Sequence, residues 1–384
     1  MNILIDGFPL MFVKTGIGFY IHNIIKELVR LAPENAYYLY DTLAKERLHT
    51  IVRVDRRLSA LERFSRISSV QFPYMTAARV ALFLSSLTTG GNRLSLNNTD
   101  VFWGTNCRGI YKKHMRTVVT IHDMAHEYFP EAVHPDVLSY IKRYMAEAAS
   151  NAHTLIAVSE NTRMDIMKFL KVDPSRIKVV HEGVSDEFRI IQDPDLLNTI
   201  KDRYNLPDNF IFALGTIQPR KNIPRLLEAF ALLCDNPSFK HWLVISGAYG
   251  WKNKTVYSSI ANLGITNRVR FTGYVAQGDL PGIYNLADVF VYPSLYEGFG
   301  LPVLEAMACG VPVVTSKVSS IPEVAGNCAL MVDPTKVDDI AMAIEAILSD
   351  NELRQSLSTQ APQQARKFTW QRCATETLLT LQGD

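Results

Sequence analysis

Two glutamates that bracket a glycine-rich turn are the residues of this sequence best suited to do chemistry. Glu297 precedes the turn and Glu305 follows it. A short apolar run before the turn, Val289–Tyr292, is an expected buried strand. Glycines between them let the backbone bend and approach a ligand, and the turn enters a helix whose N-terminal amides favour an anion. Because a carboxylate beside a phosphate would repel it, we expect both glutamates to accept hydrogen bonds from sugar hydroxyls. The amides of the turn belong to Gly298, Phe299, Gly300 and Leu301.

A pair of cations forms a second candidate cluster. Arg220 and Lys221 lie between an expected strand, Phe210–Leu214, and an expected helix, Ile223–Cys234. At such a junction an arginine can bind a diphosphate with two N–H groups, and a lysine can add a point charge. The alternative is a solvated basic turn on the surface.

Polar residues also follow an expected strand of the N-terminal half, Thr117–Ile121. His122 and Asp123 come directly after it, and His126 lies a few residues further on. In an open α/β sheet the ligand lies outside the carboxyl ends of the strands. His122 could therefore hydrogen-bond a sugar hydroxyl or bridge a donor and an acceptor. A lone histidine there is equally compatible with a structural role.

Glycines near the N-terminus allow two interpretations. Gly16 and Gly18 lie between an expected strand, Asn2–Asp6, and an expected helix, Phe19–Leu31. They permit either a tight turn with positive φ or a close approach of backbone amides to a ligand. The GxGxxG pattern of dinucleotide-binding enzymes is not met, which disfavours a dehydrogenase. Ser159 precedes another expected helix, Arg163–Leu170, where it is a natural N-cap as well as a candidate substrate contact.

The string from Glu297 to Val314, EGFGLPVLEAMACGVPVV, resembles the signature of retaining glycosyltransferases of family 4, which have the GT-B fold. This resemblance implies an α/β protein with two doubly wound Rossmann-like domains facing across a cleft. The ends of two further expected strands, Trp242–Ser246 and Val269–Phe271, would flank the base of a nucleotide.

The resemblance also assigns roles to individual residues. It implies that Arg220 and Lys221 hold the donor diphosphate, Glu297 the donor sugar and Glu305 the ribose, with His122 beside the sugar. The residues expected to be catalytic are His122, Arg220, Lys221 and Glu297. The residues expected to bind substrate are Gly16, Gly18, Asp123, Ser159, Thr216, Gly247, Tyr274, Val275, Gly298, Phe299, Gly300, Leu301 and Glu305. The sequence departs from the family pattern at Thr216, where many relatives have Arg, and at Glu182, where many have Asn.

The same string is similar to that of bacterial mannosyltransferases of surface polysaccharide assembly. It implies GDP-mannose as donor and an undecaprenyl-linked oligosaccharide or growing polymannose chain as acceptor, with UDP-glucose, UDP-galactose and UDP-N-acetylglucosamine as alternatives. The strand-end motifs include no acidic DxD-type cluster, so we expect neither a metal nor another cofactor. No second carboxylate stands in a nucleophile position, which favours a front-face reaction. An epimerase, a phosphorylase and a non-catalytic sugar-nucleotide sensor are rival interpretations.

Length and composition set the remaining limits. A chain of 384 residues suggests two domains. We expect them at 1–189 and 190–366, with a C-terminal helix at 367–384 packing back on the first. A net charge of +2 gives no reason to expect nucleic acid, and five scattered cysteines indicate a reducing cytosol without a disulfide framework or zinc site.

The expected location is cytoplasmic. The N-terminus leads straight into a strand, so we expect no signal peptide. No apolar run reaches the roughly 18 residues of a membrane span. Arg53–Arg93 mixes arginines with apolar residues, and it is either a helix pair with a solvated face or a segment that lies on an anionic membrane surface.

Overall fold

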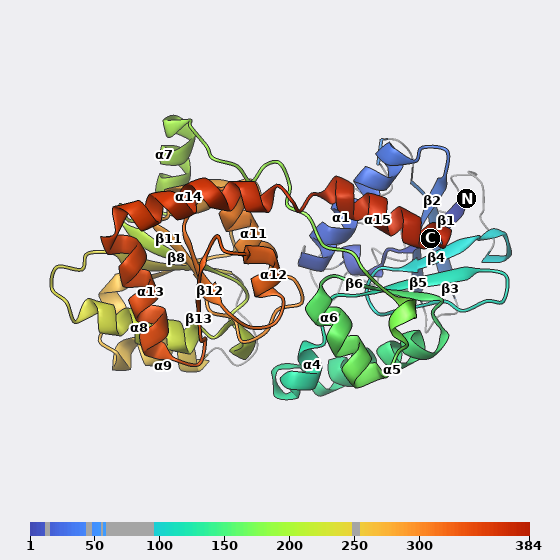
Figure 1. Ribbon diagram of the computed structural model, residues 1–384, viewed down its shortest axis with the longest axis horizontal. Helices are drawn as coiled ribbons and strands as arrows, with labels where there is room; N and C mark the ends of the chain where they lie inside the picture. The colour runs from blue at the N-terminus through green and yellow to red at the C-terminus, as the bar shows by residue number, and fades with distance from the viewer. Residues whose placement is uncertain (12–15, 44–47, 55–56, 59–95, 248–253) are drawn as a thin grey trace. The chain divides into compact units, whose positions relative to one another are not determined.

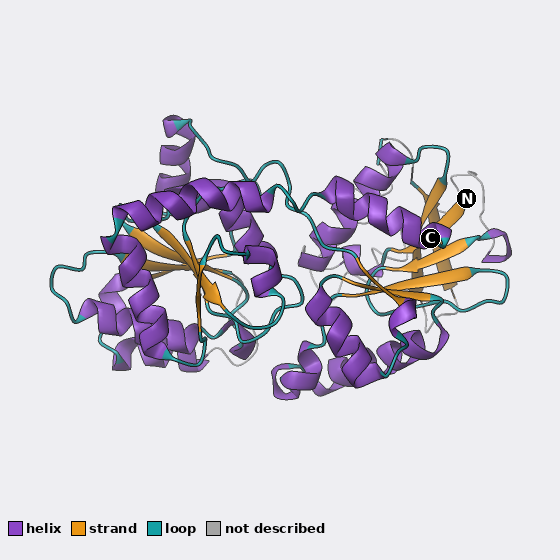
Figure 2. Cartoon of the chain, viewed as in Figure 1, coloured by secondary structure: helices purple, strands orange, loops and turns teal. Residues whose placement is uncertain are grey.

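The computed structural model describes residues 1–11, 16–43, 48–54, 57–58, 96–247 and 254–384 (Figure 1). The chain divides into two compact units. Unit 1 comprises residues 1–124, 134–183 and 369–384, and unit 2 comprises residues 125–133 and 184–368. In each unit helices cover a central sheet (Figure 2).

Unit 1 is built on a sheet with the strand order β3-β2-β1-β4-β5-β6-β7. Its strands are β1 (Asn2–Asp6), β2 (Ala36–Leu43), β3 (Leu48–Arg53), β4 (Val101–Gly104), β5 (Arg116–Ile121), β6 (Thr154–Ala157) and β7 (Ile177–Val179). Neighbours run parallel except β2 and β3, which pair antiparallel at one edge. The strands β1, β4, β5 and β6 in the middle of the sheet are largely buried, as expected for strands covered by helices on each side, whereas the edge strand β7 exposes Lys178.

Helices from opposite ends of the chain lie together on unit 1. α1 (Gly16–Leu31) packs against α15 (Trp370–Gln382), and α15 also contacts β5 (Figure 1). Ile121 of β5 belongs to a core built with α5 (Pro135–Asn151) and the π-helix η4 (Ile166–Leu170). α6 (Glu160–Asp165) directly precedes η4. Short 3-10 helices in this unit are η1 (Phe8–Met11), η2 (Leu96–Asn98) and η5 (Pro174–Arg176).

Unit 2 contains an all-parallel sheet with the order β10-β9-β8-β11-β12-β13. Its strands are β8 (Phe210–Leu214), β9 (Trp242–Ser246), β10 (Val269–Gly273), β11 (Val289–Tyr292), β12 (Val313–Ser316) and β13 (Leu330–Val332). Because successive side chains of a strand point to opposite faces, β11 serves two cores. Val289 and Val291 join one core, whereas Phe290 packs on Phe212 and Tyr284 on the other side.

The helices of unit 2 follow this division. α8 (Ile223–Cys234), α9 (Lys254–Asn262) and α13 (Val337–Ser349) build the valine side. The others in this unit are α4 (Ala125–Tyr128), η3 (Pro130–Ala132), α7 (Pro194–Arg203), η6 (Pro219–Lys221), η7 (Thr266–Arg268), α10 (Leu280–Leu286), α11 (Leu301–Ala308), α12 (Ile321–Ala325) and α14 (Asn351–Ala365).

Differences from the expected elements are concentrated in unit 1. The sheet there is not entirely parallel, because β3 adds an antiparallel edge. The helix expected at Arg163–Leu170 begins at Glu160 and changes to a π-helix at Ile166. In unit 2 the expected bounds of β8, β9 and β11 are those observed.

Candidate active site

The carboxyl ends of β8, β9, β11 and β12 meet at one edge of the unit 2 sheet. Gly215 follows β8 and Gly247 follows β9, with φ of +144° and +142°. A Cβ atom on Gly247 would lie 2.2 Å from the carbonyl oxygen of Gly215, and one on Gly215 would touch the Lys221 side chain at 3.3 Å. Glycine is therefore required at both positions for these two strand ends to approach each other and the lysine.

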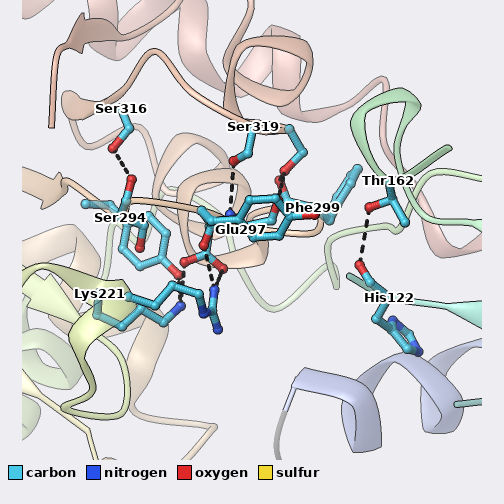
Figure 3. A network of polar contacts seen from close by, with 12 residues as sticks. His122, Thr162, Lys221, Ser294, Glu297, Phe299, Ser316 and Ser319 are labelled. Atoms are coloured by element: carbon cyan, nitrogen blue, oxygen red, sulfur yellow. Dashed lines mark hydrogen bonds and ion pairs between the residues drawn. The ribbon is translucent and has the colours of Figure 1, made fainter. Parts of the chain in front are cut away.

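A buried carboxylate binds both expected cations at this edge. Glu297 Oε2 lies 2.6 Å from Arg220 Nη1, and Glu297 Oε1 lies 2.7 Å from Lys221 Nζ (Figure 3). Arg220 Nη1 also donates to the carbonyl of Tyr296 at 2.8 Å, and the Lys221 ammonium donates to the hydroxyl of Tyr292. The structure thus brings together three of the residues expected to be catalytic.

Electrostatics keep this carboxylate ionised. Burial alone would raise the pKa of Glu297, but the facing charges of Arg220 and Lys221 outweigh burial and lower the pKa to about 2. Glu297 was expected to contact sugar hydroxyls. In this structure its two oxygens instead neutralise the cations expected to bind phosphate, so the carboxylate occupies the place of an anion.

Serine hydroxyls hold the glycine-rich turn in position. Ser319 Oγ accepts from the main-chain N–H of Glu297 at 2.9 Å, and Ser320 Oγ donates to the carbonyls of Glu297 and Phe299 at 2.9 and 2.8 Å. Ser316 Oγ donates to the carbonyl of Ser294 at 2.6 Å (Figure 3). Ser320 occupies the N-cap position of α12, but its side chain makes no capping hydrogen bond to that helix.

A left-handed residue marks this serine loop. Ser319 has a φ of +53°, which is unusual for a residue other than glycine. The sequence offered little signal for the loop beyond a polar turn after β12. Asn222, with a φ of +59°, was also missed, and its side chain donates to the carbonyls of Pro293 and Pro334 at 3.0 and 2.6 Å.

The turn enters α11 through Gly300, whose φ of +114° favours glycine. Pro302 has no N–H, and the N–H groups of Val303 and Leu304 donate to the carbonyl of Gly300 at 3.0 and 3.3 Å. The amide of Leu301 and those of the turn before it are therefore the candidates to bind an anion here. Phe299 is only 3% exposed and its ring packs on Phe368. Its side chain is therefore not a substrate contact, and only its main chain remains a candidate.

Glu305, in α11, is partly buried beside Tyr284, whose hydroxyl donates to Glu305 Oε2 at 3.1 Å. Burial raises the pKa of this carboxyl to about 8, although the bond from Tyr284 opposes the shift. The carboxyl is therefore mainly protonated at neutral pH in the absence of a ligand.

Glu305 should make the stability of unit 2 depend on pH. The carboxyl titrates near 4.5 in the unfolded chain and near 8 in the folded one. Between these values the folded protein keeps a proton that the unfolded chain has lost, so stability is full below about pH 4.5 and falls as pH rises to about 8, by up to about 1.4 kcal/mol per pH unit.

Melting curves of the wild type and of Glu305→Gln, recorded from pH 5 to pH 8, measure this effect. We expect the variant to lose less stability than the wild type over this range, because glutamine does not titrate. Parallel profiles for the two proteins would contradict a protonated Glu305.

The residues expected to flank the nucleotide base lie at the ends of β8, β9 and β10, and they differ in exposure. Gly247 N–H donates to the carbonyl of Gly273 at 2.8 Å, so the ends of β9 and β10 lie side by side. Tyr274 and Thr216 are exposed there. Val275 is only 7% exposed, so its side chain belongs to the packing of this edge.

His122, in unit 1, has both ring nitrogens hydrogen-bonded. Nδ1 pairs with Glu182 Oε1 at 3.0 Å, and Nε2 lies 3.0 Å from the carbonyl oxygen of Thr105, which can only accept. Tyr20 packs edge-on against the imidazole at a centroid distance of 4.6 Å. A hydrogen bond from this ring to a sugar would have to break one of these contacts. Glu182, where the sequence departs from the family pattern, is therefore the partner of His122.

Removal of that partner should destabilise unit 1. We expect Glu182→Ala to lower stability by about 1–3 kcal/mol, since it leaves a buried ring nitrogen without its hydrogen bond. Glu182→Gln keeps an oxygen at this position and should cost less. Calorimetric melting of both variants measures the difference, and equal losses would show that the contact contributes nothing specific.

The other N-terminal candidates have mostly structural surroundings. Ser159 is fully buried and caps α6, since its Oγ accepts from the N–H of Thr162 at 3.0 Å, so we withdraw it as a substrate contact. Gly16 and Gly18 lie in the first turn of α1 and provide no left-handed turn. A Cβ atom on Gly18 would meet nothing within 4 Å, which leaves room beside the helix. Asp123 is partly buried.

His126 is buried, with Nε2 3.4 Å from Glu127 Oε1. Within the described ranges, no group of three or more His, Cys, Asp or Glu side chains could hold a metal ion. No helix in the described part of the chain is long and apolar enough to cross a membrane. Of the arginine-rich segment Arg53–Arg93, residues 55–56 and 59–93 lie outside the described residues.

Comparisons with known proteins identify the family of this chain. The family model described as glycosyl transferases group 1 matches residues 198–364, and the model for glycosyltransferase family 4 matches residues 15–188. The O-antigen chain mannosyltransferase B of Escherichia coli is 36% identical over 264 residues, which are 68% of this chain and 69% of that protein. The serotype-specific mannosyltransferase WbdA of E. coli is 33% identical over 59% of this chain, but that match spans only 28% of WbdA.

Solved structures give the fold. Anabaena Alr3699/HepE in complex with UDP and glucose matches over the full length of both chains with a TM-score of 0.71 at 18% identity. WaaG, a glycosyltransferase involved in lipopolysaccharide biosynthesis, matches over the full length with a TM-score of 0.69 at 15% identity. The expected GT-B fold is thereby confirmed, and the family matches show that this chain belongs to the group 1 glycosyltransferases, with an N-terminal domain of glycosyltransferase family 4.

Proposed function

We propose that this glycosyltransferase moves mannose from GDP-mannose to a hydroxyl of a lipid-linked or polysaccharide acceptor during cell-surface glycan synthesis. The observation that carries the proposal is the Arg220–Lys221–Glu297 cluster beside the start of α11. The names of the E. coli relatives, an O-antigen chain mannosyltransferase and a serotype-specific mannosyltransferase, support the choice of sugar and of acceptor class.

The donor diphosphate would bind the two cations and the main-chain amides of Gly298–Leu301, which lead into α11. As the bond between the sugar and the diphosphate breaks, negative charge grows on the leaving phosphate, and fixed donors at that place stabilise it. Positive side chains and helix amides would thus do the work that a metal ion does in other transferases. We therefore infer that the enzyme needs no metal or other cofactor.

Glu297 and Glu305 would then bind the hydroxyls of the donor sugar and of the ribose. Once phosphate oxygens engage Arg220 and Lys221, the Glu297 carboxylate can turn to the hydroxyls of the sugar. Glu305 would accept from the hydroxyls of the ribose, which favours its ionised form. His122 belongs to unit 1, and its expected place beside the donor sugar rests on the family resemblance.

The reaction would proceed with retention through a front-face route. The bond between the anomeric carbon and the phosphate oxygen breaks, the acceptor oxygen bonds to the same carbon from the same face, and the acceptor proton passes to the departing phosphate. No side chain forms a covalent intermediate in this route. Trapping of a sugar attached to the protein would exclude it.

We also place the enzyme in the cytoplasm, at the inner face of the cytoplasmic membrane. A lipid-linked acceptor would present its sugar there, and the mixture of arginines and apolar residues in Arg53–Arg93 suits an anionic surface.

A donor panel tests the proposal. The protein is melted with GDP-mannose, UDP-glucose, UDP-galactose or UDP-N-acetylglucosamine, and a ligand present at 100 times its Kd adds about 2.7 kcal/mol of stability. We expect GDP-mannose to give the largest shift, and mannose transfer to depend on an added glycan acceptor. A larger increase of the melting temperature with a UDP-sugar would overturn GDP-mannose as the donor. Sugar conversion without an acceptor would indicate an epimerase, and no transfer from any donor would overturn the function.

A further inference from the structure

Tyr292 is a buried ionisable residue with no role in the mechanism above. It ends β11 and is 2% exposed, with its ring stacked on Phe290 at a centroid distance of 5.8 Å. Its main-chain carbonyl accepts from Thr315 Oγ1 at 2.9 Å, which ties the residue to β12. Burial and the nearby Glu297 carboxylate raise the pKa of Tyr292 well above 10, so the hydroxyl keeps its proton. The position of this side chain is therefore fixed by the sheet.

The Lys221 side chain is held on three sides. Its stem passes over Gly215, where even a Cβ atom would come within 3.3 Å. Its ammonium lies 4.7 Å from the centroid of the Tyr292 ring, a distance suited to a cation–π contact, and donates to the Tyr292 hydroxyl. The same ammonium donates to Glu297 Oε1 at 2.7 Å.

We propose that Tyr292 is a positioning residue for glycosyl transfer, whose hydroxyl fixes the direction of the Lys221 ammonium toward the donor diphosphate. This inference rests on the proposed function, since it takes Lys221 as a diphosphate ligand. An ammonium can only donate hydrogen bonds, so the phenol oxygen must accept from it.

The physical reason lies in the flexibility of lysine. A free lysine side chain loses rotamer entropy when it is ordered. When the protein orders the side chain in advance, ligand binding no longer carries that cost. If Glu297 turns to the sugar when the donor binds, the Tyr292 hydroxyl still accepts from the Lys221 ammonium and keeps it directed at the phosphate.

A double-mutant cycle separates this role from simple packing. Tyr292→Phe keeps the ring and the cation–π contact but removes the hydroxyl. In the wild-type background we expect it to raise the Kd of GDP several-fold and to lower kcat about tenfold. In a Lys221→Ala background the same substitution should change either quantity by less than twofold, because the ammonium that the hydroxyl directs is gone.

A matched control is Tyr37→Phe, which removes another buried hydroxyl, one that donates to the carbonyls of Leu28 and Ala32 in unit 1. This control should leave GDP binding and transfer unchanged. Melting curves of all variants show whether each is folded.

Two failures can be told apart. Equal effects of Tyr292→Phe in the two backgrounds would overturn the positioning role while mannose transfer by the wild type stands. An absence of transfer by the wild type would overturn the proposed function. In that case the Kd of GDP, measured for the same four proteins, still shows whether Tyr292 acts through Lys221. If Tyr292→Phe changes this Kd equally with and without Lys221, the inference is overturned.

Discussion

Replacement of Glu297 by glutamine should reduce glycosyl transfer by about 100- to 1,000-fold, the usual effect of removing one fixed electrostatic contact at a reacting centre, while the affinity for GDP is kept or increased. The ionised carboxylate neutralises Arg220 and Lys221 at 2.6 and 2.7 Å. A diphosphate must displace it from these cations. Glutamine carries no charge, so it competes less with the diphosphate for the two cations. For the same reason it forms weaker hydrogen bonds with the sugar hydroxyls and with Arg220 and Lys221.

The measurements are kcat with GDP-mannose and an acceptor, and the Kd of GDP by calorimetry. Glu228→Gln serves as control, since it removes one negative charge from an exposed position on α8 of the same unit. Its transfer rate and GDP affinity should be those of the wild type. A Glu297→Gln protein that loses GDP binding and transfer in the same proportion would show that the carboxylate acts only by arranging the nucleotide site.

Loss of Arg220 should weaken both GDP binding and sugar transfer. We expect Arg220→Ala to weaken GDP binding at least tenfold, because a hydrogen bond to a charged group contributes about 1.5–3 kcal/mol. It should lower kcat/KM by about 100- to 1,000-fold, since the charge on the leaving phosphate increases in the transition state. Arg220 Nη1 bonds both Tyr296 and Glu297 in the free protein. Lysine has no planar fork to reproduce this geometry, so Arg220→Lys should recover little activity.

Arg203→Ala is the matched control for Arg220. Arg203 also lies in unit 2 and pairs with Asp279 at 2.7 Å, but its side chain is 54% exposed. Exposed ion pairs contribute at most about 1 kcal/mol to stability, so this variant should bind GDP and transfer sugar normally. If Arg220→Ala bound GDP as tightly as Arg203→Ala, Arg220 would not be a diphosphate ligand.

Local patterns in the sequence were enough to predict most of unit 2. Short apolar runs ended by glycine or proline gave the bounds of β8, β9 and β11, because buried parallel strands are apolar on both faces. The family resemblance assigned Glu297, Arg220 and Lys221 to different parts of one donor, and the structure brings the three side chains together. The sequence pattern did not predict that Glu297 would form ion pairs with Arg220 and Lys221. These pairs depend on the order of the strands in the sheet, because the residues are far apart in the chain.

Contacts between distant residues were beyond the sequence. Glu182 and His122 are 60 residues apart and meet only because β5 and the segment after β7 end at the same edge of the sheet. The hydroxyls of Ser319 and Ser320 bond the glycine-rich turn more than twenty residues earlier. The antiparallel pair β2–β3 was missed as well. Its outer member β3, LHTIVR, is an edge strand without the continuous apolar run that marks the central strands.

A crystal structure of the protein with GDP-mannose tests the central claim most directly. Both phosphates should lie within hydrogen-bond distance of Arg220 and Lys221, with one of them at the first turn of α11 and the Glu297 carboxylate turned away from the cations toward the sugar. A diphosphate bound elsewhere, with Glu297 still paired to both cations, would contradict it.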